Sequence, residues 1–174
     1  MDGRDSTNGR QEKISQKESG VRHTMEKLLW SVALPGFGHL LYGKYLKGIL
    51  FILLEFIINI KANLNVVIIS SFHGNIQQAI EQVDYEWLLF YPCLYFFVMW
   101  DAYKGAGGGK KPYSFLPFVS SAYIVTVGTV YSSTFTVFGV LLGPVWLPIL
   151  SMIPGWAVGM LLQKLIMKLK PSID

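Results

Sequence analysis

The stretch YLKGILFILLEFIINIKA, from Tyr45 to about Ala62, decides the structural class of this chain. It approaches the roughly 20 predominantly apolar residues that an α-helix needs to cross a 30 Å hydrocarbon core. Lys47 lies near one end of the stretch, from where a long side chain can reach the lipid headgroups. The stretch therefore predicts a first membrane span.

Three later stretches are also predicted to cross a membrane. Trp87 to Tyr103 is rich in aromatic residues and has them at both ends, as expected for anchors at the two headgroup levels. Phe115 to about Thr134 is rich in small and hydroxyl-bearing residues, which allow helices to approach closely in lipid. Val145 to Met167 contains Pro148 and Pro154 and predicts one kinked span, preceded by a short dip.

Two further segments are apolar but are not expected to cross. Leu28 to Tyr42 is short and is interrupted by Pro35, which favours an interfacial or re-entrant helix pair. Leu64 to Glu86 predicts an amphipathic helix on the outer face, because its apolar residues recur every three or four positions: Ile69, Phe72, Ile76, Ile80 and Val83. The predicted fold is an all-α, polytopic membrane bundle of about four spans with these two additional helical segments.

The composition agrees with a membrane protein and not with a soluble domain. Of the 174 residues, 52% are hydrophobic and 15% are charged, whereas soluble domains contain about 25% charged residues. Residues 1–27 mix both signs of charge without an apolar core, so we expect a disordered polar cytoplasmic tail before a single integral membrane domain at residues 28–170. The net charge of +4 does not indicate nucleic-acid binding, because the basic residues flank apolar runs.

The lysines and arginines predict the orientation in the membrane. If residues 28–42 do not cross, all of the 15 basic residues except Lys61 fall on one side of the membrane. Basic residues near span ends favour the cytoplasmic side. We therefore expect a multi-pass protein of the bacterial inner membrane with both termini in the cytoplasm.

Glu55 is the most informative single residue, because it falls near the middle of the first predicted span. A carboxylate at that depth costs a few kcal/mol or more unless it is neutralised, paired or hydrated. One interpretation is a proton- or cation-linked transport site. The other is a structural glutamate that is hydrogen-bonded to a neighbouring helix.

Two further sets of residues are expected to make contacts within the membrane or at its surface. Two G-x-x-x-G spacings, Gly139/Gly143 and Gly155/Gly159, are typical of closely packed helices. The loop KGAGGGKKP carries Lys104, Lys110 and Lys111, which we expect to contact anionic lipid headgroups.

No stretch of the sequence predicts an enzyme, a metal site or a bound cofactor. The glycine-rich loop lacks the first Gly and the final Ser or Thr of a phosphate-binding loop. The histidines His23, His39 and His73 do not share a helical face as metal ligands would. Cys93 is the only cysteine, so an internal disulfide is excluded.

The stretch LPGFGHLLYGKYLKG, Leu34 to Gly48, resembles the signature of bacterial two-transmembrane-domain proteins and related small membrane proteins of Gram-positive bacteria. The matching positions are Pro35, Gly36, Phe37, Gly38, Tyr42, Gly43, Lys47 and Gly48. His39 stands where the family usually has Gln, and WDAYKGA, Trp100 to Ala106, is similar to the end of a following span in such proteins. The resemblance implies a bacterial inner-membrane protein with a Pro-Gly turn, and it implies no particular activity.

From these patterns we expect a non-catalytic integral membrane protein, an accessory, scaffold or assembly component that acts through helix–helix and lipid contacts. Its partners would be membrane lipids and either another membrane protein or further copies of the chain. The alternative is a small transporter or channel subunit that uses Glu55.

Overall fold

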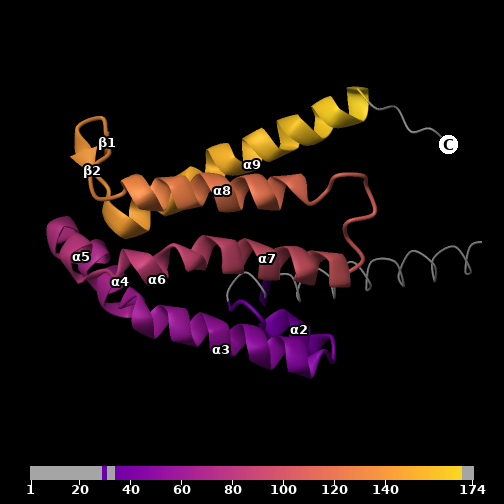
Figure 1. Cartoon of the computed structure of the whole chain (residues 1–174), viewed down its shortest axis with the longest axis horizontal. Helices are drawn as coiled ribbons and strands as arrows, with labels where there is room; N and C mark the ends of the chain where they lie inside the picture. Colours follow the sequence, from indigo (N-terminus) through magenta and orange to yellow (C-terminus); the bar gives the residue numbers. More distant parts are fainter. Residues whose placement is uncertain (1–28, 31–33, 170–174) are drawn as a thin grey trace, which may run out of the picture.

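The computed structural model describes residues 29–30 and 34–169, and these are mostly helical, which confirms the all-α class (Figure 1). The predicted tail, residues 1–27, lies outside the described residues. The four long helices run back and forth along one axis (Figure 1): α3 (Tyr45–Lys61), α7 (Phe90–Gly105), α8 (Leu116–Tyr131) and α9 (Gly143–Leu169).

Only one described helix, α9, is by itself long and apolar enough to cross a membrane. Helix α3 passes the same criterion together with α4 (Leu64–Phe72), but the two are bent by 64° at the break between them. Helix α8 is apolar and shorter. Pro148 and Pro154 lie inside α9, which remains one continuous helix in place of the expected shorter span.

The segment between α3 and α7 corrects one prediction. The expected single amphipathic helix is divided into α4, α5 (Ile76–Gln82) and α6 (Tyr85–Leu88). Polar side chains fold these helices against each other: Ser70 Oγ donates to Gln82 Oε1 at 2.7 Å. Asp84 starts α6 by accepting from the backbone N–H of Glu86 and Trp87.

The predicted apolar stripe of that segment is also wrong in part. Ile69 and Phe72 are exposed, whereas Val67 and Ser71 face inward. The inward face belongs to a core at this end of the bundle, formed by Ala62, Leu64, Val67, Ala79, Val83, Leu88 and Val145. Helical periodicity predicts the helices but not which face meets the bundle, because apolar side chains lie on both the buried and the exposed side of α4.

A β-hairpin replaces the dip expected before α9. Strands β1 (Thr136–Val137) and β2 (Val140–Leu141) pair antiparallel. Gly139 lies in the turn with φ 80°, and Gly143 has φ 71° where α9 begins, so the pair is not the helix-packing motif that its spacing predicted. The G-x-x-x-G spacing has that meaning only when both glycines are in one helix.

Candidate functional site

The Pro-Gly turn places a short helix, α2 (Phe37–Leu41), against the beginning of α3. Gly36 has φ 95°, and a Cβ at this position would lie 2.9 Å from the carbonyl oxygen of Gly48. In the same contact, a Cβ on Gly48 would lie 2.8 Å from Leu40 Cγ. Gly36 and Gly48, two of the four glycines of the motif, are therefore explained by the close approach of α2 to α3.

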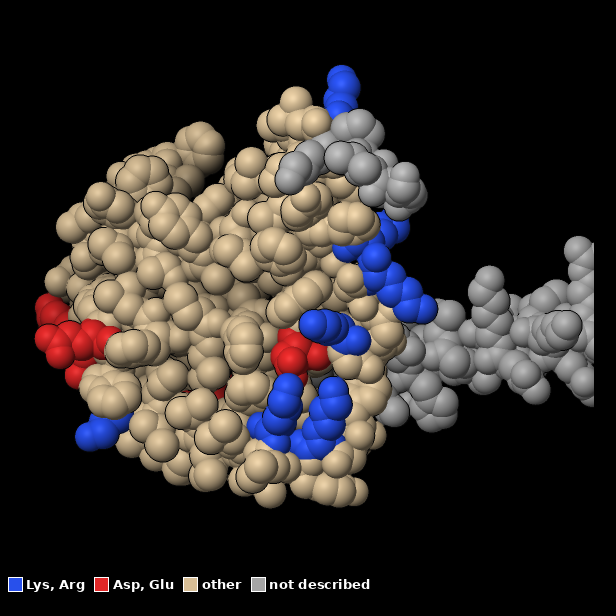
Figure 2. All heavy atoms as spheres, turned by 45° about the vertical axis from the view of Figure 1, so that its right-hand side comes forward, with Lys and Arg blue, Asp and Glu red and all other residues tan. Residues whose placement is uncertain are grey.

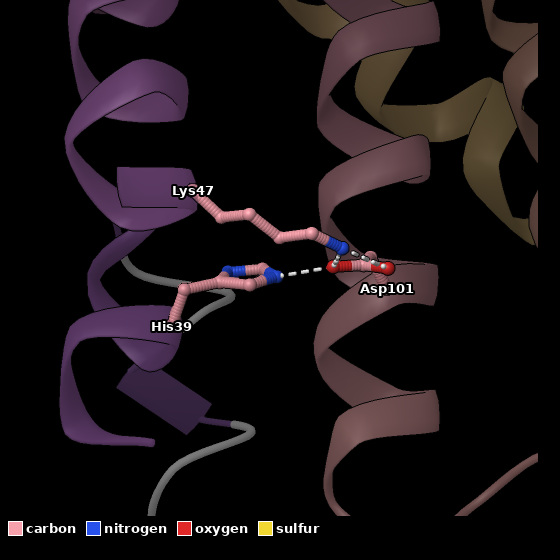
Figure 3. A network of polar contacts seen from close by, with 3 residues as sticks. All are labelled: His39, Lys47 and Asp101. Carbon is pink, nitrogen blue, oxygen red and sulfur yellow. Dashed lines mark hydrogen bonds and ion pairs between the residues drawn. The ribbon is translucent and has the colours of Figure 1, made fainter. Parts of the chain in front are cut away.

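This turn buries His39, which is 1% exposed, and presents it to α7. Its ring packs edge-on against Phe51 with the centroids 5.0 Å apart. Its Nε2 lies 2.8 Å from Asp101 Oδ2, and Lys47 Nζ lies 3.1 Å from the same oxygen and 3.3 Å from Oδ1 (Figure 3). Residues from α2, α3 and α7 thus meet in one polar cluster, the His39–Lys47–Asp101 cluster.

The geometry of this cluster is suited to joining helices. When the Nε2 of His39 donates to Asp101, catalysis by the imidazole would need a reacting group on Nδ1. Within the described part of the chain, Nδ1 has no hydrogen-bond partner. Asp101 is 21% exposed and Lys47 is 53% exposed, so this ion pair lies at the surface of the described structure.

The sequence patterns do not predict that His39, Lys47 and Asp101 are in contact. The sequence patterns predict that Lys47 reaches the lipid headgroups, and they assign no contact to His39 or Asp101. His39 and Asp101 are 62 positions apart. The available signal was that all three residues lie in the two stretches that carry the family resemblance.

Glu55 points to a neighbouring helix. Tyr91 Oη donates to Glu55 Oε1 at 3.5 Å, and Oε2 has no hydrogen-bond partner among the residues described. Tyr91 also lines a cavity of about 320 Å³ between α4, α7, α8 and α9. The other lining residues are mostly apolar, among them Leu64, Val125 and Met152. Glu55 is not among the residues that line this cavity, and its hydrogen bond from Tyr91 is a contact between α3 and α7.

Gly155 and Gly159 lie where α9 meets α8. A Cβ on Gly155 would lie 2.7 Å from the Cα of Ser121, and one on Gly159 would collide with the backbone of Pro117. One turn earlier, Ser151 of α9 occupies the space beside Gly128 of α8. This face of α9 is filled by the chain itself and is not free for another protein.

Lys104 lies in the last turn of α7 and not in the loop, whereas Lys110 and Lys111 lie between α7 and α8, and all three are exposed. Lys44 and Lys47 are exposed at the same end of the bundle, where α3 begins. Figure 2 shows basic side chains gathered at this end, while most acidic side chains lie at the opposite end. Within residues 29–30 and 34–169, no three His, Cys, Asp or Glu side chains are grouped as metal ligands.

No protein-family model, curated protein or solved structure matches the chain.

Proposed function

We propose that the chain is an integral protein of a bacterial inner membrane, with α3, α7, α8 and α9 as four spans and both termini in the cytoplasm. The observation that carries this proposal is the separation of charge along the helix axis (Figure 2). Lysines gather where α3 begins and α7 ends, whereas Glu81, Asp84 and Glu86 lie at the other end with Lys61. The basic end is the cytoplasmic end by the positive-inside rule.

The surface between the two ends also supports a membrane environment. Large apolar side chains are exposed along the long helices, including Leu46 (85%), Phe56 (62%) and Leu161 (65%). Water-soluble monomers rarely expose contiguous apolar patches larger than a few hundred Å². In a bilayer the same side chains contact acyl chains.

The lengths of the helices are compatible with four spans. At 1.5 Å per residue, the 17 residues of α3 extend about 25 Å, a few ångströms less than a typical hydrocarbon core. Such a mismatch costs only fractions of a kcal/mol per ångström, because the bilayer thins locally. Helix α6 precedes α7 with only Leu89 between them and adds length to that span.

Within this membrane protein, we propose a non-catalytic accessory or scaffold role that depends on helix–helix and lipid contacts. The His39–Lys47–Asp101 cluster supports this role, because its polar side chains join α2, α3 and α7. The same cluster supports kinship with bacterial two-transmembrane-domain proteins, since it unites the two stretches that resemble them. A partner would bind the exposed face of α3, because the glycine face of α9 is already filled by α8.

Cysteine labelling in intact cells tests the orientation. In a Cys93→Ser background, we expect Gln78→Cys on α5 to react with a membrane-impermeant maleimide and Lys110→Cys to react only after the membrane is opened. Both native side chains are exposed, so access through protein is not limiting. Labelling of Lys110→Cys in intact cells would overturn the proposed topology.

Native mass spectrometry of protein extracted gently with its lipids tests the accessory role. We expect a stoichiometric complex with a membrane protein or with further copies of the chain. Extraction of the chain as a monomer, with lipids bound but without a protein partner, would contradict that role.

A small transporter or channel subunit is the second candidate function. The specific observation in its favour is Glu55 Oε2, which lacks a hydrogen-bond partner in the described residues although Glu55 lies inside a proposed span. Transport predicts a flux that Glu55→Gln abolishes in a folded protein.

A further inference from the structure

The β-hairpin before α9 has an unusual residue at its tip. Val137 pairs with Val140, so Phe138 and Gly139 form a two-residue turn. Both have positive φ, 51° and 80°, which fits the turn type that favours Asn-Gly or Asp-Gly. A bulky side chain in the left-handed region is strained, and such strain is retained mainly where it serves a function.

The fold does not compensate for this strain. Phe138 is 102% exposed, so its ring packs against nothing in the described chain. Phe135 and Val140 beside it are 54% and 59% exposed. Together these three residues, the hairpin tip, present apolar surface that nothing in the described part of the chain covers.

The base of the hairpin fixes the level of the tip in the bundle. Tyr85 and Ser132 are hydrogen-bonded through their hydroxyl groups at 3.1 Å, so the chain leading to the hairpin is tied to α6. Asp84 caps the start of α6, and Glu86 lies in its first turn. Figure 1 shows the hairpin at this end of the bundle, beside the start of α9 and opposite the basic end.

We propose that the hairpin tip inserts into the headgroup region of the outer leaflet and anchors the α8–α9 pair there. This inference rests on the proposed membrane topology. The sequence contains no Asp, Glu, Lys or Arg between Lys111 and Lys164, so the hairpin brings no charge into the lipid. Its apolar surface also continues that of Val130 and Tyr131, which are exposed at the end of α8.

The unpaired polar groups of the backbone limit how deep the hairpin can enter the bilayer. Two paired residues per strand leave other N–H and C=O groups that need water, so the backbone stays at headgroup depth. The Phe138 ring reaches the acyl boundary, the depth at which interfacial helices bury Trp, Phe and Leu side chains. The rim of a protein interface, by contrast, is usually polar.

Spin-label accessibility in phospholipid vesicles tests this placement. In a Cys93→Ser background, a nitroxide is attached to Phe138→Cys, to Gln78→Cys on α5 and to Leu53→Cys in the middle of α3. We expect the Phe138 label to collide with oxygen, which concentrates in lipid, severalfold more than with a water-soluble nickel complex. The Gln78 label should show the opposite preference, and the Leu53 label should favour oxygen most strongly.

Each other outcome is informative. A Phe138 label with the Gln78 pattern overturns the anchor while the Leu53 label still reports a span, and a Leu53 label in water overturns the topology itself. A Phe138 label shielded from both reagents indicates a second copy of the chain and also overturns the lipid anchor. Phe138→Asn should leave the thermal midpoint in detergent equal or higher, and a lower midpoint would show that the ring packs within the fold.

Discussion

Helices α3 and α7 are joined at the basic end by charged side chains, whereas α8 and α9 meet through small residues along their length. In the first contact, Asp101 of α7 binds His39 and Lys47 through side chains, so the helix backbones need not touch. The second removes side chains at Gly155 and Gly159 so that the two backbones touch. In the membrane environment that we propose, apolar burial gives little advantage, so hydrogen bonds and close packing are the two remaining means of holding helices together.

The largest effect is expected from breaking the α8–α9 contact. Gly159→Leu would place a side chain in the backbone of Pro117, which cannot move away without shifting α8. Overpacking of this kind costs about 3 kcal/mol, so we expect a strong loss of stability or of folded protein. Unfolding by titration with SDS in mixed micelles measures it.

Ala157→Leu is the matched control for that substitution. Ala157 lies on the same helix but is exposed, so the same added side chain should reach lipid and leave stability unchanged. Equal stability of the Gly159 and Ala157 variants would show that the α8–α9 contact is not close in the membrane.

A smaller effect is expected from the charged contact. Asp101→Leu leaves the buried His39 without its partner, which costs about 2 kcal/mol. Lys47→Met should cost less than about 1 kcal/mol, because the Lys47 side chain is half exposed. Asp101→Asn retains an acceptor for His39 and should fall between the two. If Lys47→Met were the more damaging change, the ion pair and not the histidine would hold α2 and α3 to α7.

Glu55 provides a third case, because its polar contact with Tyr91 lies away from both ends of the bundle. Glu55→Gln keeps an acceptor for Tyr91, so we expect a change in stability below about 1 kcal/mol. Tyr91→Phe, which removes the donor, should be the more destabilising substitution. Cation and proton flux into liposomes is the second measurement, and a flux lost in Glu55→Gln would favour transport over helix packing.

How much the sequence could predict differs between these regions. The long helices follow from runs of apolar residues, and α3 ends within one residue of the predicted boundary. The glycine face of α9 follows from spacing within one helix, but its partner, α8, does not. The same spacing at Gly139 and Gly143 was misleading because the chain turns there, and the turn depends on a hairpin of only two residues per strand.

The His39–Lys47–Asp101 cluster could not be derived from local pattern. Each of its residues has an ordinary explanation in its own segment, and only the packing of α2, α3 and α7 brings them together. The division of residues 64–88 into three helices was missed for a similar reason. Its causes are single hydrogen bonds, such as Ser70 to Gln82, that periodicity does not detect.

The smallest effect is expected at the loop lysines, which extend the charged end beyond the cluster. Each basic residue at an anionic surface contributes on the order of fivefold in affinity for anionic lipid. Lys110→Gln and Lys111→Gln should therefore reduce the anionic lipid retained in native mass spectra while leaving stability unchanged, because both side chains are exposed. Lys61→Gln is the control, since Lys61 lies at the opposite end and its Nζ lies over the Trp87 ring at 5.9 Å. Equal losses from Lys61 and the loop lysines would mean that anionic lipid does not distinguish the two ends of the bundle.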